Sequence, residues 1–315
     1  MALRIVALGA GGVGGFFGGL MAAAGAVEVA FVARGAHLEA MRRGGLTIER
    51  DGGRPPVRLP RPVVAEDPAA LGPADVVILG VKLADTDAAI GAARPLVERG
   101  AAIVSLQNGV TKDDALREAF GPGPVMGGVA YVASHIARPG VVAQTGPMAR
   151  LLVGEHDGRR SDRAERLAAA ARAAGIDAAV PPDIGVAIWQ KFAFLVGLSG
   201  ATAAARMPIG PVRADPHARA FLRGLVEEAV AVGRARGVAL PEDEVEEAMR
   251  RVDTVPPAMT ASLHHDLEAG RRLEVPWLSG AVADLGAALG VPTPCNAAVR
   301  AILAPRVAGR PEGAS

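Results

Sequence analysis

A glycine-rich turn near the start of the chain has the spacing that binds a dinucleotide. The run Gly9, Ala10, Gly11, Gly12, Val13, Gly14 fits the pattern G-x-G-x-x-G. In this pattern Gly9 permits a tight turn, Gly11 lets the backbone approach a pyrophosphate, and Gly14 lets the following helix pack closely against the strand. A chain with 40 glycines also matches such a pattern by chance. Here a strand, the motif, a helix and a second strand follow in the expected order, so the motif predicts a dinucleotide site with the phosphates at the helix N-terminus.

The first charged residue after the second predicted strand is Arg34. Proteins that bind NAD usually have Asp or Glu at this point to bind the ribose 2′-hydroxyl. An arginine suits a 2′-phosphate instead, because its planar guanidinium makes paired, charge-assisted hydrogen bonds. The alternative is a solvent-exposed arginine at the start of a loop. We therefore expect NADP, as NADPH, to be the cofactor.

Lys191 lies in the most apolar predicted helix of the chain, between Trp189 and Phe192. Desolvation at such a position favours the neutral amine and suits a lysine to proton transfer. An ammonium there also stabilises a developing alkoxide. The alternative is a lysine that extends its charged end to solvent from the edge of a core helix. Its position between two aromatic residues favours a chemical role.

Short apolar runs alternate with helical patterns through the first half of the chain. Runs over residues 4–8, 27–33, 74–81 and 101–106 are nearly all apolar, as strands buried on both faces of a parallel sheet are. The segment 46–62 predicts a hairpin excursion, and 125–154 predicts short antiparallel strands separated at Pro139-Gly140 and Gly146-Pro147. A surface helix is expected over 159–175. The pattern predicts a doubly wound α/β domain whose mostly parallel sheet has antiparallel additions.

Two consecutive prolines, Pro181 and Pro182, block helix continuation and predict a domain boundary. Gly237 and Gly290 stand where helix C-caps are expected. Helical periods run over 183–206, 213–237, 242–252, 257–269, 276–290 and 296–303. We therefore expect a Rossmann-type NADP-binding domain at 1–181, an all-α substrate and catalytic domain at 182–305, and a disordered tail at 306–315.

The composition excludes several classes of function. A length of 315 residues suits two domains, and a net charge of +1 gives no reason to expect nucleic acid or a membrane as the main partner. The longest apolar run of the second half, 184–205, contains Gln190 and Lys191, which favours a buried core helix over a membrane span. The single Cys295 excludes an intrachain disulfide, fits a reducing, cytoplasmic setting and, with scattered histidines, predicts no metal site.

Several of these segments together resemble the ketopantoate reductase (2-dehydropantoate 2-reductase) family. The resemblance spans residues 1–303, and the motifs of the second half are far more specific than the glycine pattern. In the first half the similar segments are 9–14, V-A-R at 32–34, V-K at 81–82 and Q-N-G at 107–109. In the second half they are I-W-Q-K-F at 188–192, which is similar to the catalytic-lysine helix, the segment from Ser262 to Val275, and L-G-V-P-T-P at 289–294.

The resemblance implies NADPH-dependent reduction of ketopantoate to pantoate by hydride transfer, a step in pantothenate biosynthesis. Lys191 would be the general acid that protonates the carbonyl oxygen, and Glu274 would bind the substrate hydroxyl and help to position that lysine. Asn108 would lie near the nicotinamide and the substrate, Ser262 would bind the substrate carboxylate, and Lys82 would contact the cofactor. Asn108 also follows an apolar strand at its carboxyl end, where open α/β sheets bind ligands.

Four charged or titratable residues of the same segment are expected to lie outside the chemistry. His264 and His265 titrate near neutrality, yet we expect them at the surface or in support of other residues. Asp266 and Arg271 are expected to pair with each other or to serve a domain interface. Two residues of this segment are predicted to bind the substrate, and each has an alternative without a functional role. Glu274 would then be a solvated carboxylate, and Ser262 would be a helix N-terminal residue with no ligand.

The chain departs from the family's pattern at two positions. The family usually has asparagines four and eight residues after the lysine, where this chain has Leu195 and Ser199. A site that hydrogen-bonds a hydroxyl discriminates strongly, and an apolar Leu195 cannot do so. Ser199 keeps a hydroxyl and is a candidate substrate ligand. A reductase for a different 2-oxo acid or a bulkier ketone is therefore an alternative function.

Two further classes of protein share parts of this pattern. A 6-phosphogluconate-type dehydrogenase would need a glycine-rich substrate loop before the lysine, and no such loop is present. A non-catalytic NADP-binding sensor would need neither Lys191 nor Glu274. The expected partner is a small 2-oxo acid, and the apolar faces of the helical half leave room for a homodimer.

Overall fold

The computed structural model describes residues 2–25 and 27–310. The chain divides into two compact units, and the main division falls between Ile184 and Gly185. The sequence placed this boundary three residues earlier, and it did not predict that the short segment after the strand expected over 101–106 would group with the second unit. The first unit comprises Met1–Gln107 and Lys112–Ile184, and the second comprises Asn108–Thr111 and Gly185–Ser315.

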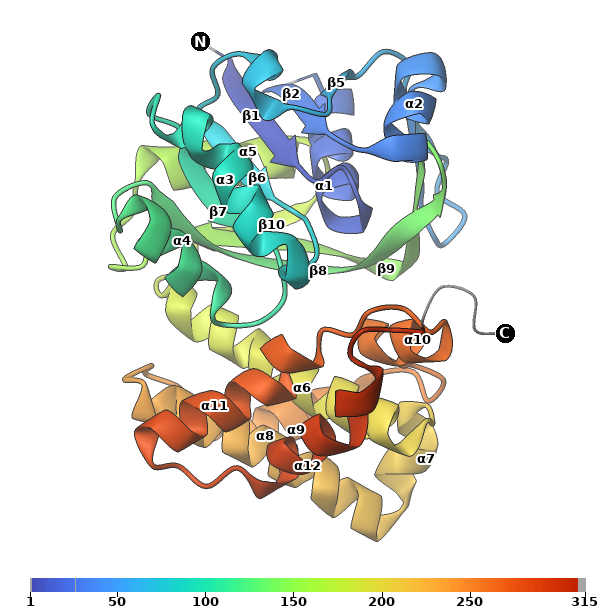
Figure 1. The fold of residues 1–315 in the computed structure, drawn as a ribbon, viewed down its shortest axis with the longest axis vertical. Coiled ribbons are helices and arrows are strands. Elements are labelled where there is room, and N and C mark those ends of the chain that lie inside the picture. Colours follow the sequence, from blue (N-terminus) through green and yellow to red (C-terminus); the bar gives the residue numbers. More distant parts are fainter. Residues whose placement is uncertain (1, 26, 311–315) are drawn as a thin grey trace. The chain divides into compact units, whose positions relative to one another are not determined.

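The first unit is built on one mixed sheet (Figure 1). Its strands over the described residues are β1 (Leu3–Leu8), β2 (Val27–Val32), β3 (Leu46–Glu49), β4 (Val57–Leu59), β5 (Val63–Ala65), β6 (Val76–Leu79), β7 (Ala102–Ser105), β8 (Val125–Arg138), β9 (Val141–Gly154) and β10 (Asp177–Ala179). Their order is β4-β3-β9-β8-β7-β6-β1-β2-β5, with β10 paired to β9. Only β3–β4 and β8–β9 pair antiparallel, which confirms the mostly parallel sheet and the predicted hairpin at 46–62.

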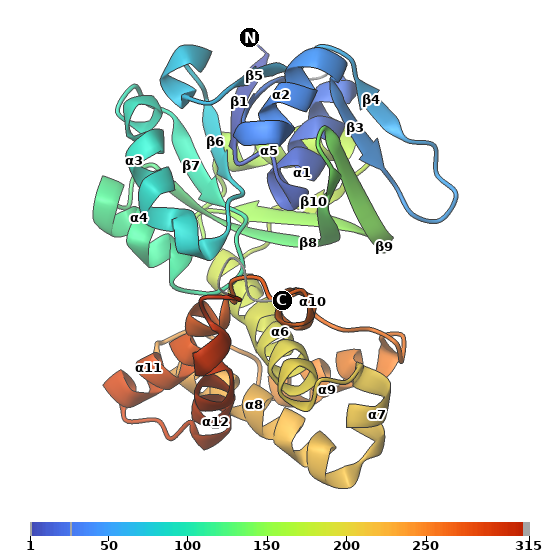
Figure 2. The same ribbon diagram turned by 45° about the vertical axis from the view of Figure 1, so that its right-hand side comes forward.

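The central strands are buried on both faces because helices cover both. Alternate residues of β1 belong to different core clusters: Ile5 packs with Phe16 and the α1 side, whereas Val6 packs with Leu96 and the α3 side. Figure 2 shows these helices around the sheet. The helices are α1 (Gly12–Ala23), α2 (Gly35–Gly44), α3 (Thr86–Val97), α4 (Lys112–Phe120) and α5 (Asp162–Ala173), with 3₁₀ turns η1 (Pro68–Leu71) and η2 (Leu83–Asp85).

The prediction of several short strands over 125–154 is wrong in one respect. The turn at Pro139-Gly140 is present, but β8 and β9 are each 14 residues long and β9 runs through Gly146-Pro147. The register shifts there, from Tyr131 opposite Arg150 to Ala133 opposite Thr145. A β-bulge therefore absorbs the Gly-Pro pair without ending the strand.

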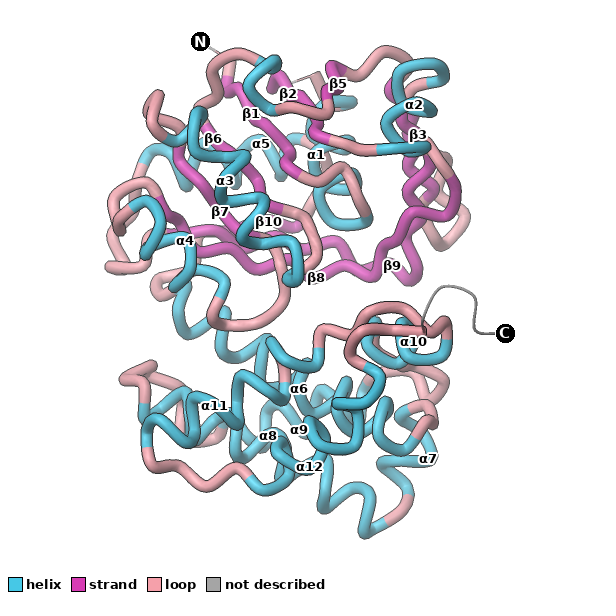
Figure 3. The backbone as a smooth tube through the Cα atoms, viewed as in Figure 1, coloured by secondary structure: helices cyan, strands magenta, loops and turns pink. Residues whose placement is uncertain are grey.

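The regular elements of the second unit are all helices or 3₁₀ turns among its described residues, joined by loops (Figure 3). Its elements are α6 (Ile184–Ala205), α7 (Ile209–Ala214), α8 (Pro216–Ala235), α9 (Glu244–Thr254), α10 (Ser262–Glu268), η3 (Val275–Trp277), α11 (Ser279–Leu289), α12 (Pro294–Leu303) and η4 (Ala304–Arg306). Gly237 and Gly290 have φ angles of 83° and 71°, so left-handed residues follow α8 and α11 as predicted.

Three helix predictions in this half need correction. The helix expected over 213–237 is broken at Asp215, whose side chain accepts from the Ala218 N–H and caps α8, with Pro216 as its first residue. The helix expected over 257–269 starts only at Ser262, because the Pro257 carbonyl oxygen accepts instead from the Gly210 N–H. The helix expected over 276–290 is preceded by the separate turn η3.

The predicted disordered tail is wrong for residues 306–310. The Leu273 N–H donates to the Val307 carbonyl oxygen at 2.9 Å, and the Arg310 N–H donates to the Gly270 carbonyl oxygen at 2.8 Å. These bonds fix the chain end beside the segment that leads to Glu274. Residues 311–315 lie outside the described residues.

Helix α6, with 22 residues, is the longest helix among the described residues. By length and composition it could cross a membrane, yet 67% of its most apolar window is buried inside the protein. Trp189 and Phe192 meet edge to face, with ring centroids 5.5 Å apart, and both are buried. This is the packing expected for a core helix, in agreement with the prediction from the sequence.

A buried carboxyl group contacts α6 next to its lysine. Glu244 of α9 is 1% exposed, and its Oε2 accepts from Gln190 Nε2 at 2.6 Å. Its Oε1 is buried and has no hydrogen-bond partner among the described residues. Burial raises the pKa of Glu244 above its usual value.

We predict that Glu244→Gln stabilises the protein at alkaline pH. Because the folded-state pKa lies above the unfolded one, ionisation costs the folded state free energy as the pH rises through the folded pKa. Urea midpoints of both proteins at about pH 5 and about pH 8 test this. The gain of the variant should be larger at the higher pH, and an equal change at both values would contradict the assignment.

Candidate active site

Four parallel strands of the first unit present their carboxyl ends at one edge of the sheet. β1 pairs with β2 and β6, and β6 pairs with β7, all in parallel. Gly9 follows β1, Arg34 follows β2, Lys82 follows β6 and Gln107 follows β7. The structure therefore brings the predicted cofactor residues of this unit to the edge where open α/β sheets bind ligands.

The glycines of the first turn differ in what surrounds them. Gly9 has a φ of 99°, and a Cβ atom there would lie 2.7 Å from Val81 Cγ1. A Cβ atom at Gly14 would lie 2.2 Å from the Gly9 carbonyl oxygen, so α1 packs as closely on the turn as the motif predicts. At Gly11 a Cβ atom would meet nothing within 4 Å. Gly9 and Gly14 thus allow the turn and α1 to pack closely against their neighbours, whereas the space beside Gly11 is open to a ligand.

The start of α1 has the properties of an anion site. Gly11 is the N-cap residue and makes no side-chain cap hydrogen bond. The first N–H groups of a helix have no acceptors within the helix, and the helix dipole places positive potential there. Gly12 cannot carry a side chain, because a Cβ atom would lie 2.3 Å from the Ser134 carbonyl oxygen. The backbone at this position fits the pyrophosphate of a dinucleotide.

A buried histidine that the sequence did not single out supports this turn. His37 of α2 is 9% exposed, and its Nε2 lies 2.9 Å from the Ala10 carbonyl oxygen. The Gly140 N–H donates to His37 Nδ1 at 3.1 Å, so Nε2 carries the proton donated to Ala10. Burial lowers the pKa of His37, which favours this neutral form. No motif or periodicity marks His37, because its partners are distant in sequence.

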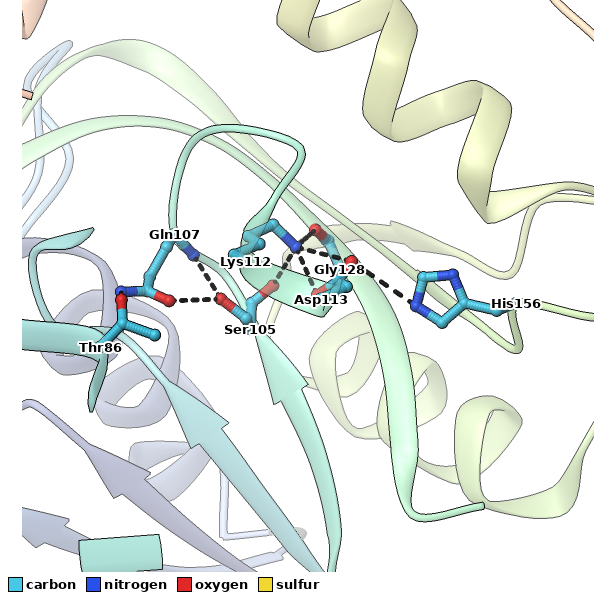
Figure 4. Close-up of polar contacts among 7 residues, drawn as sticks. All are labelled: Thr86, Ser105, Gln107, Lys112, Asp113, Gly128 and His156. Atoms are coloured by element: carbon cyan, nitrogen blue, oxygen red, sulfur yellow. Dashed lines mark hydrogen bonds and ion pairs between the residues drawn. The ribbon is translucent and has the colours of Figure 1, made fainter. Parts of the chain in front are cut away.

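A glutamine amide joins the loops that follow β6 and β7. Gln107 Nε2 donates to Thr86 Oγ1 at 2.9 Å and to the Lys82 carbonyl oxygen at 3.3 Å. Its Oε1 accepts from Ser105 Oγ at 2.9 Å (Figure 4). The backbone that carries Lys82 is thereby tied to the backbone that leads to Asn108. The sequence identified Gln107 only as a neighbour of Asn108.

The two predicted cationic cofactor residues lie at the surface. Arg34 is exposed and is the N-cap residue of α2. Lys82 is exposed and precedes η2. Both positions are accessible to a ligand at the sheet edge, and their roles in cofactor binding stay predictions.

The second unit places the predicted acid beside an amide oxygen. Lys191 is half-buried in the middle of α6, and its Nζ donates to Asn108 Oδ1 at 2.9 Å. Asn108 belongs to the short segment that groups with this unit. Two residues 83 positions apart in sequence, both predicted as site residues, are thus in direct contact.

The remaining predicted substrate residues have different degrees of exposure. Glu274 is 8% exposed and precedes η3, whereas Ser262 is exposed at the first residue of α10. Leu195 is half-buried one turn after Lys191. Ser199 is fully buried, and its hydroxyl lies 3.5 Å from the Val196 carbonyl oxygen of its own helix. The substrate roles of Ser199, Ser262 and Glu274 stay predictions, and burial makes Ser199 the least accessible of them.

The charged residues expected outside the chemistry are placed as follows. Arg271 Nε donates to Asp266 Oδ1 at 2.8 Å, which confirms that these two residues pair. His265 is exposed and its Nε2 lies 2.9 Å from Thr260 Oγ1. His264 Nδ1 lies 3.0 Å from the Thr202 carbonyl oxygen. His265 thus lies at the surface and His264 lies beside the backbone of α6; that neither takes part in the chemistry stays a prediction.

Comparison with known proteins identifies a family. The profile described as "Ketopantoate reductase PanE/ApbA" matches residues 5–158, and its C-terminal counterpart matches residues 183–306. A 2-dehydropantoate 2-reductase of Mesorhizobium japonicum is 31% identical over 96% of this chain and 97% of its own length. The crystal structure of a 2-dehydropantoate 2-reductase from Geobacter metallireducens superposes with a TM-score of 0.88 at 31% identity, covering 96% of this chain and 99% of that one.

A more distant structure shares the fold alone. A D-mandelate dehydrogenase in complex with NADH and anilino(oxo)acetate superposes with a TM-score of 0.86 at 19% identity, over 97% of this chain and 98% of that one. The same fold is therefore found in a 2-dehydropantoate 2-reductase and in a D-mandelate dehydrogenase.

We predict that alanine at Gly11 impairs dinucleotide binding, whereas alanine at Gly14 impairs stability. Gly11→Ala should fold with an unchanged thermal midpoint, because its Cβ atom meets nothing within 4 Å, but should weaken dinucleotide binding about tenfold or more by obstructing the phosphate. Gly14→Ala should lower the thermal midpoint, because its Cβ atom would overlap the Gly9 carbonyl oxygen. Calorimetry and titration with NADPH fluorescence measure both. Equal loss of stability in the two variants would contradict this division of roles.

Proposed function

Because this chain belongs to the ketopantoate reductase family, we propose that it reduces the 2-oxo group of 2-dehydropantoate to the hydroxyl of pantoate with NADPH, and that Lys191 is the general acid. The family rests on the two profile matches and on relatives about 30% identical over nearly the whole chain. The cofactor's 2′-phosphate, the acid and the substrate ligands are inferred from the residues of this chain.

The observation that carries the acid assignment is the hydrogen bond from Lys191 Nζ to Asn108 Oδ1 at 2.9 Å. An amide oxygen accepts from an ammonium without removing its charge, so the lysine can retain its proton until a carbonyl oxygen needs it. Trp189 and Phe192, which flank Lys191 in sequence, are buried, and Lys191 itself is half-buried. A half-buried proton donor that a neighbouring amide oxygen holds in place is suited to protonate a developing alkoxide.

The first unit fits a nicotinamide dinucleotide. The open surroundings of Gly11 and the uncapped start of α1 would accept the pyrophosphate, and Arg34 would pair with the 2′-phosphate. When bound, the nicotinamide supplies the hydride that adds to the carbonyl carbon. The tie from His37 to the Ala10 carbonyl oxygen would keep the turn in the conformation that the phosphates need.

The protein's own residues then supply the proton and the orientation. We infer that Lys191 gives its Nζ proton to the carbonyl oxygen of the substrate, which becomes the new hydroxyl group. Glu274 is buried and would accept from a hydroxyl of the substrate, and exposed Ser262 would donate to its carboxylate. Hydride on carbon and proton on oxygen together account for the two hydrogens of the product alcohol.

The decisive test replaces Lys191 by Met and, separately, by Arg. Both variants should lose kcat by about 10²- to 10⁴-fold with 2-dehydropantoate and NADPH, because neither side chain gives up a proton at neutral pH. Arg keeps the positive charge, so it separates proton donation from charge stabilisation. NADPH consumption at 340 nm, with wild type measured alongside, gives the rates.

Two controls accompany this test. The dissociation constant of NADPH should stay within about threefold in both variants, since the cofactor residues lie on the other unit's sheet edge. Full activity of Lys191→Met would remove the general acid from the proposal. Absence of turnover in the wild type, with NADPH still bound, would instead favour a non-catalytic NADP-binding protein.

A separate prediction concerns the choice of cofactor. Arg34→Gln should lower kcat/KM for NADPH by about 10- to 100-fold, as expected for loss of a charged hydrogen-bonded pair, and leave that for NADH nearly unchanged. Arg42→Gln is the matched control, because Arg42 is also exposed on α2 but pairs with Glu39 at 3.1 Å. A wild type that prefers NADH would contradict the assignment of NADP.

A second candidate function keeps the chemistry and changes the substrate. Leu195 is half-buried one turn from Lys191, where the family pattern has an asparagine. Ser199, one turn further along α6, is buried. An apolar side chain there favours 2-oxo acids with larger apolar substituents. The same assay with a panel of such acids distinguishes the two candidate functions. Preferential turnover of a bulkier acid would show that this acid, rather than 2-dehydropantoate, is the substrate.

A further inference from the structure

The chain uses lysine at only three positions. Of its 34 Lys and Arg residues, 31 are arginines, and the lysines are Lys82, Lys112 and Lys191. Two of these have roles in the proposed reaction. Lys112 has none, although it follows Asn108 by only four residues. A lysine in a chain so strongly biased to arginine indicates a position where the guanidinium group does not fit.

Lys112 is buried, and protein acceptors take the place of water around its charged amino group. Its side chain is 2% exposed and begins α4. Nζ donates to the Ser105 carbonyl oxygen at 3.0 Å, to the Gly128 carbonyl oxygen at 3.2 Å, and to Asp113 Oδ1 at 2.9 Å (Figure 4). Acceptors from three residues converge on one nitrogen, with both carboxylate oxygens of Asp113 in reach, which suits the three protons of an ammonium group and not the planar fork of arginine.

The pair formed with Asp113 is a poor means of stabilising a fold. Asp113 is also buried, with a side chain 6% exposed, and His156 Nε2 lies 3.6 Å from its Oδ2. Removing two charges from water is costly, and apolar residues of similar size often stabilise a protein equally well or better. We therefore look for the role of this ion pair in the backbone geometry that it fixes, rather than in its contribution to stability.

Ser105 is the common anchor of the loop that carries Asn108. Its hydroxyl donates to Gln107 Oε1 at the start of the loop, and its carbonyl oxygen accepts from Lys112 at the end. Gly109 has a φ of 86°, which lets the chain turn back within this short span. The segment Asn108–Thr111 is thus attached at both ends to residues bound to Ser105.

We propose that Lys112 is a positioning residue for the reaction, which fixes the loop so that Asn108 Oδ1 meets the Lys191 ammonium. Gln107 fixes the opposite end of the same loop. Lys112 touches neither substrate nor cofactor in this role. It acts through the backbone of residues 108–111 and so determines where the proton of Lys191 is held. This inference rests on the proposed function of Lys191.

The test compares two variants that differ in the charge left behind. Lys112→Met leaves Asp113 buried without its partner and should lower the thermal midpoint. Lys112→Met with Asp113→Leu removes both charges and should fold with a midpoint at or above that of the wild type. Both should lose kcat by about tenfold or more, because a loop displaced by about 1 Å misplaces the catalytic group. KM for the 2-oxo acid and the NADPH dissociation constant should change less than about threefold.

A second readout does not need turnover. Protein labelled with ¹³C at lysine Cε gives one signal for each of the three lysines, and the Lys112 variants assign one of them by its loss. In the double variant the Lys191 signal should shift, because its contact with Asn108 is altered, while the Lys82 signal should not. Single variants of Lys82 and Lys191 complete the assignment.

The control removes a different ion pair of the first unit, formed by a buried carboxylate and a half-buried arginine. Glu155 Oε2 accepts from Arg163 Nη2 at 2.6 Å, and its other oxygen accepts from Ser161 rather than from the loop. Glu155→Leu with Arg163→Met should leave kcat and the Lys191 signal unchanged. A folded Lys112→Met, Asp113→Leu variant with wild-type kcat and an unmoved Lys191 signal would overturn the proposal. An inactive wild type would refute the proposed function, and the signals would still show whether Lys112 fixes the contact.

Discussion

The charge on Lys191 is the constraint on which the arrangement of the candidate site depends. An ammonium that is half-buried in the long apolar helix α6 loses hydration, and the loss must be offset by an acceptor. Asn108 Oδ1 supplies one at 2.9 Å. The acceptor comes from a loop far away in sequence, so its position depends on everything that shapes the loop, including Ser105, Gln107 and Lys112. A proton donor that is held in this way can be both partly desolvated and stable.

The cofactor edge of the first unit is governed by close packing rather than by charge. Gly9 and Gly14 are required because side chains would overlap the neighbouring backbone and Val81, whereas Gly11 is surrounded by open space. His37 adds a hydrogen bond to the Ala10 carbonyl oxygen and ties the turn to Gly140. One glycine motif therefore contains two kinds of glycine, one for the fold and one for the ligand.

The sequence predicted most elements of the fold but misplaced some of their ends. Near-continuous apolar runs identified β1, β2, β6 and β7, because a strand buried on both faces has no polar side. The break at Asp215 and the late start of α10 at Ser262 were missed. In both places a capping side chain or a distant carbonyl partner, rather than periodicity, decides where the helix begins. The bulge at Gly146 similarly depends on the opposite strand.

The sequence by itself predicted which residues are capable of chemistry: the glycine turn, Arg34 and Lys191 follow from residue type and spacing, and Asn108 and Glu274 from the resemblance to the family. Tertiary structure alone decided which of them meet. Lys112 and Asp113 open a charged stretch that looks like the exposed start of a helix, yet both are buried. His37 likewise gains its role from partners 27 and 103 positions away. The spacing of residues along the sequence predicts the properties of a single helix, strand or turn. Burial and hydrogen bonding depend on elements that only folding brings together.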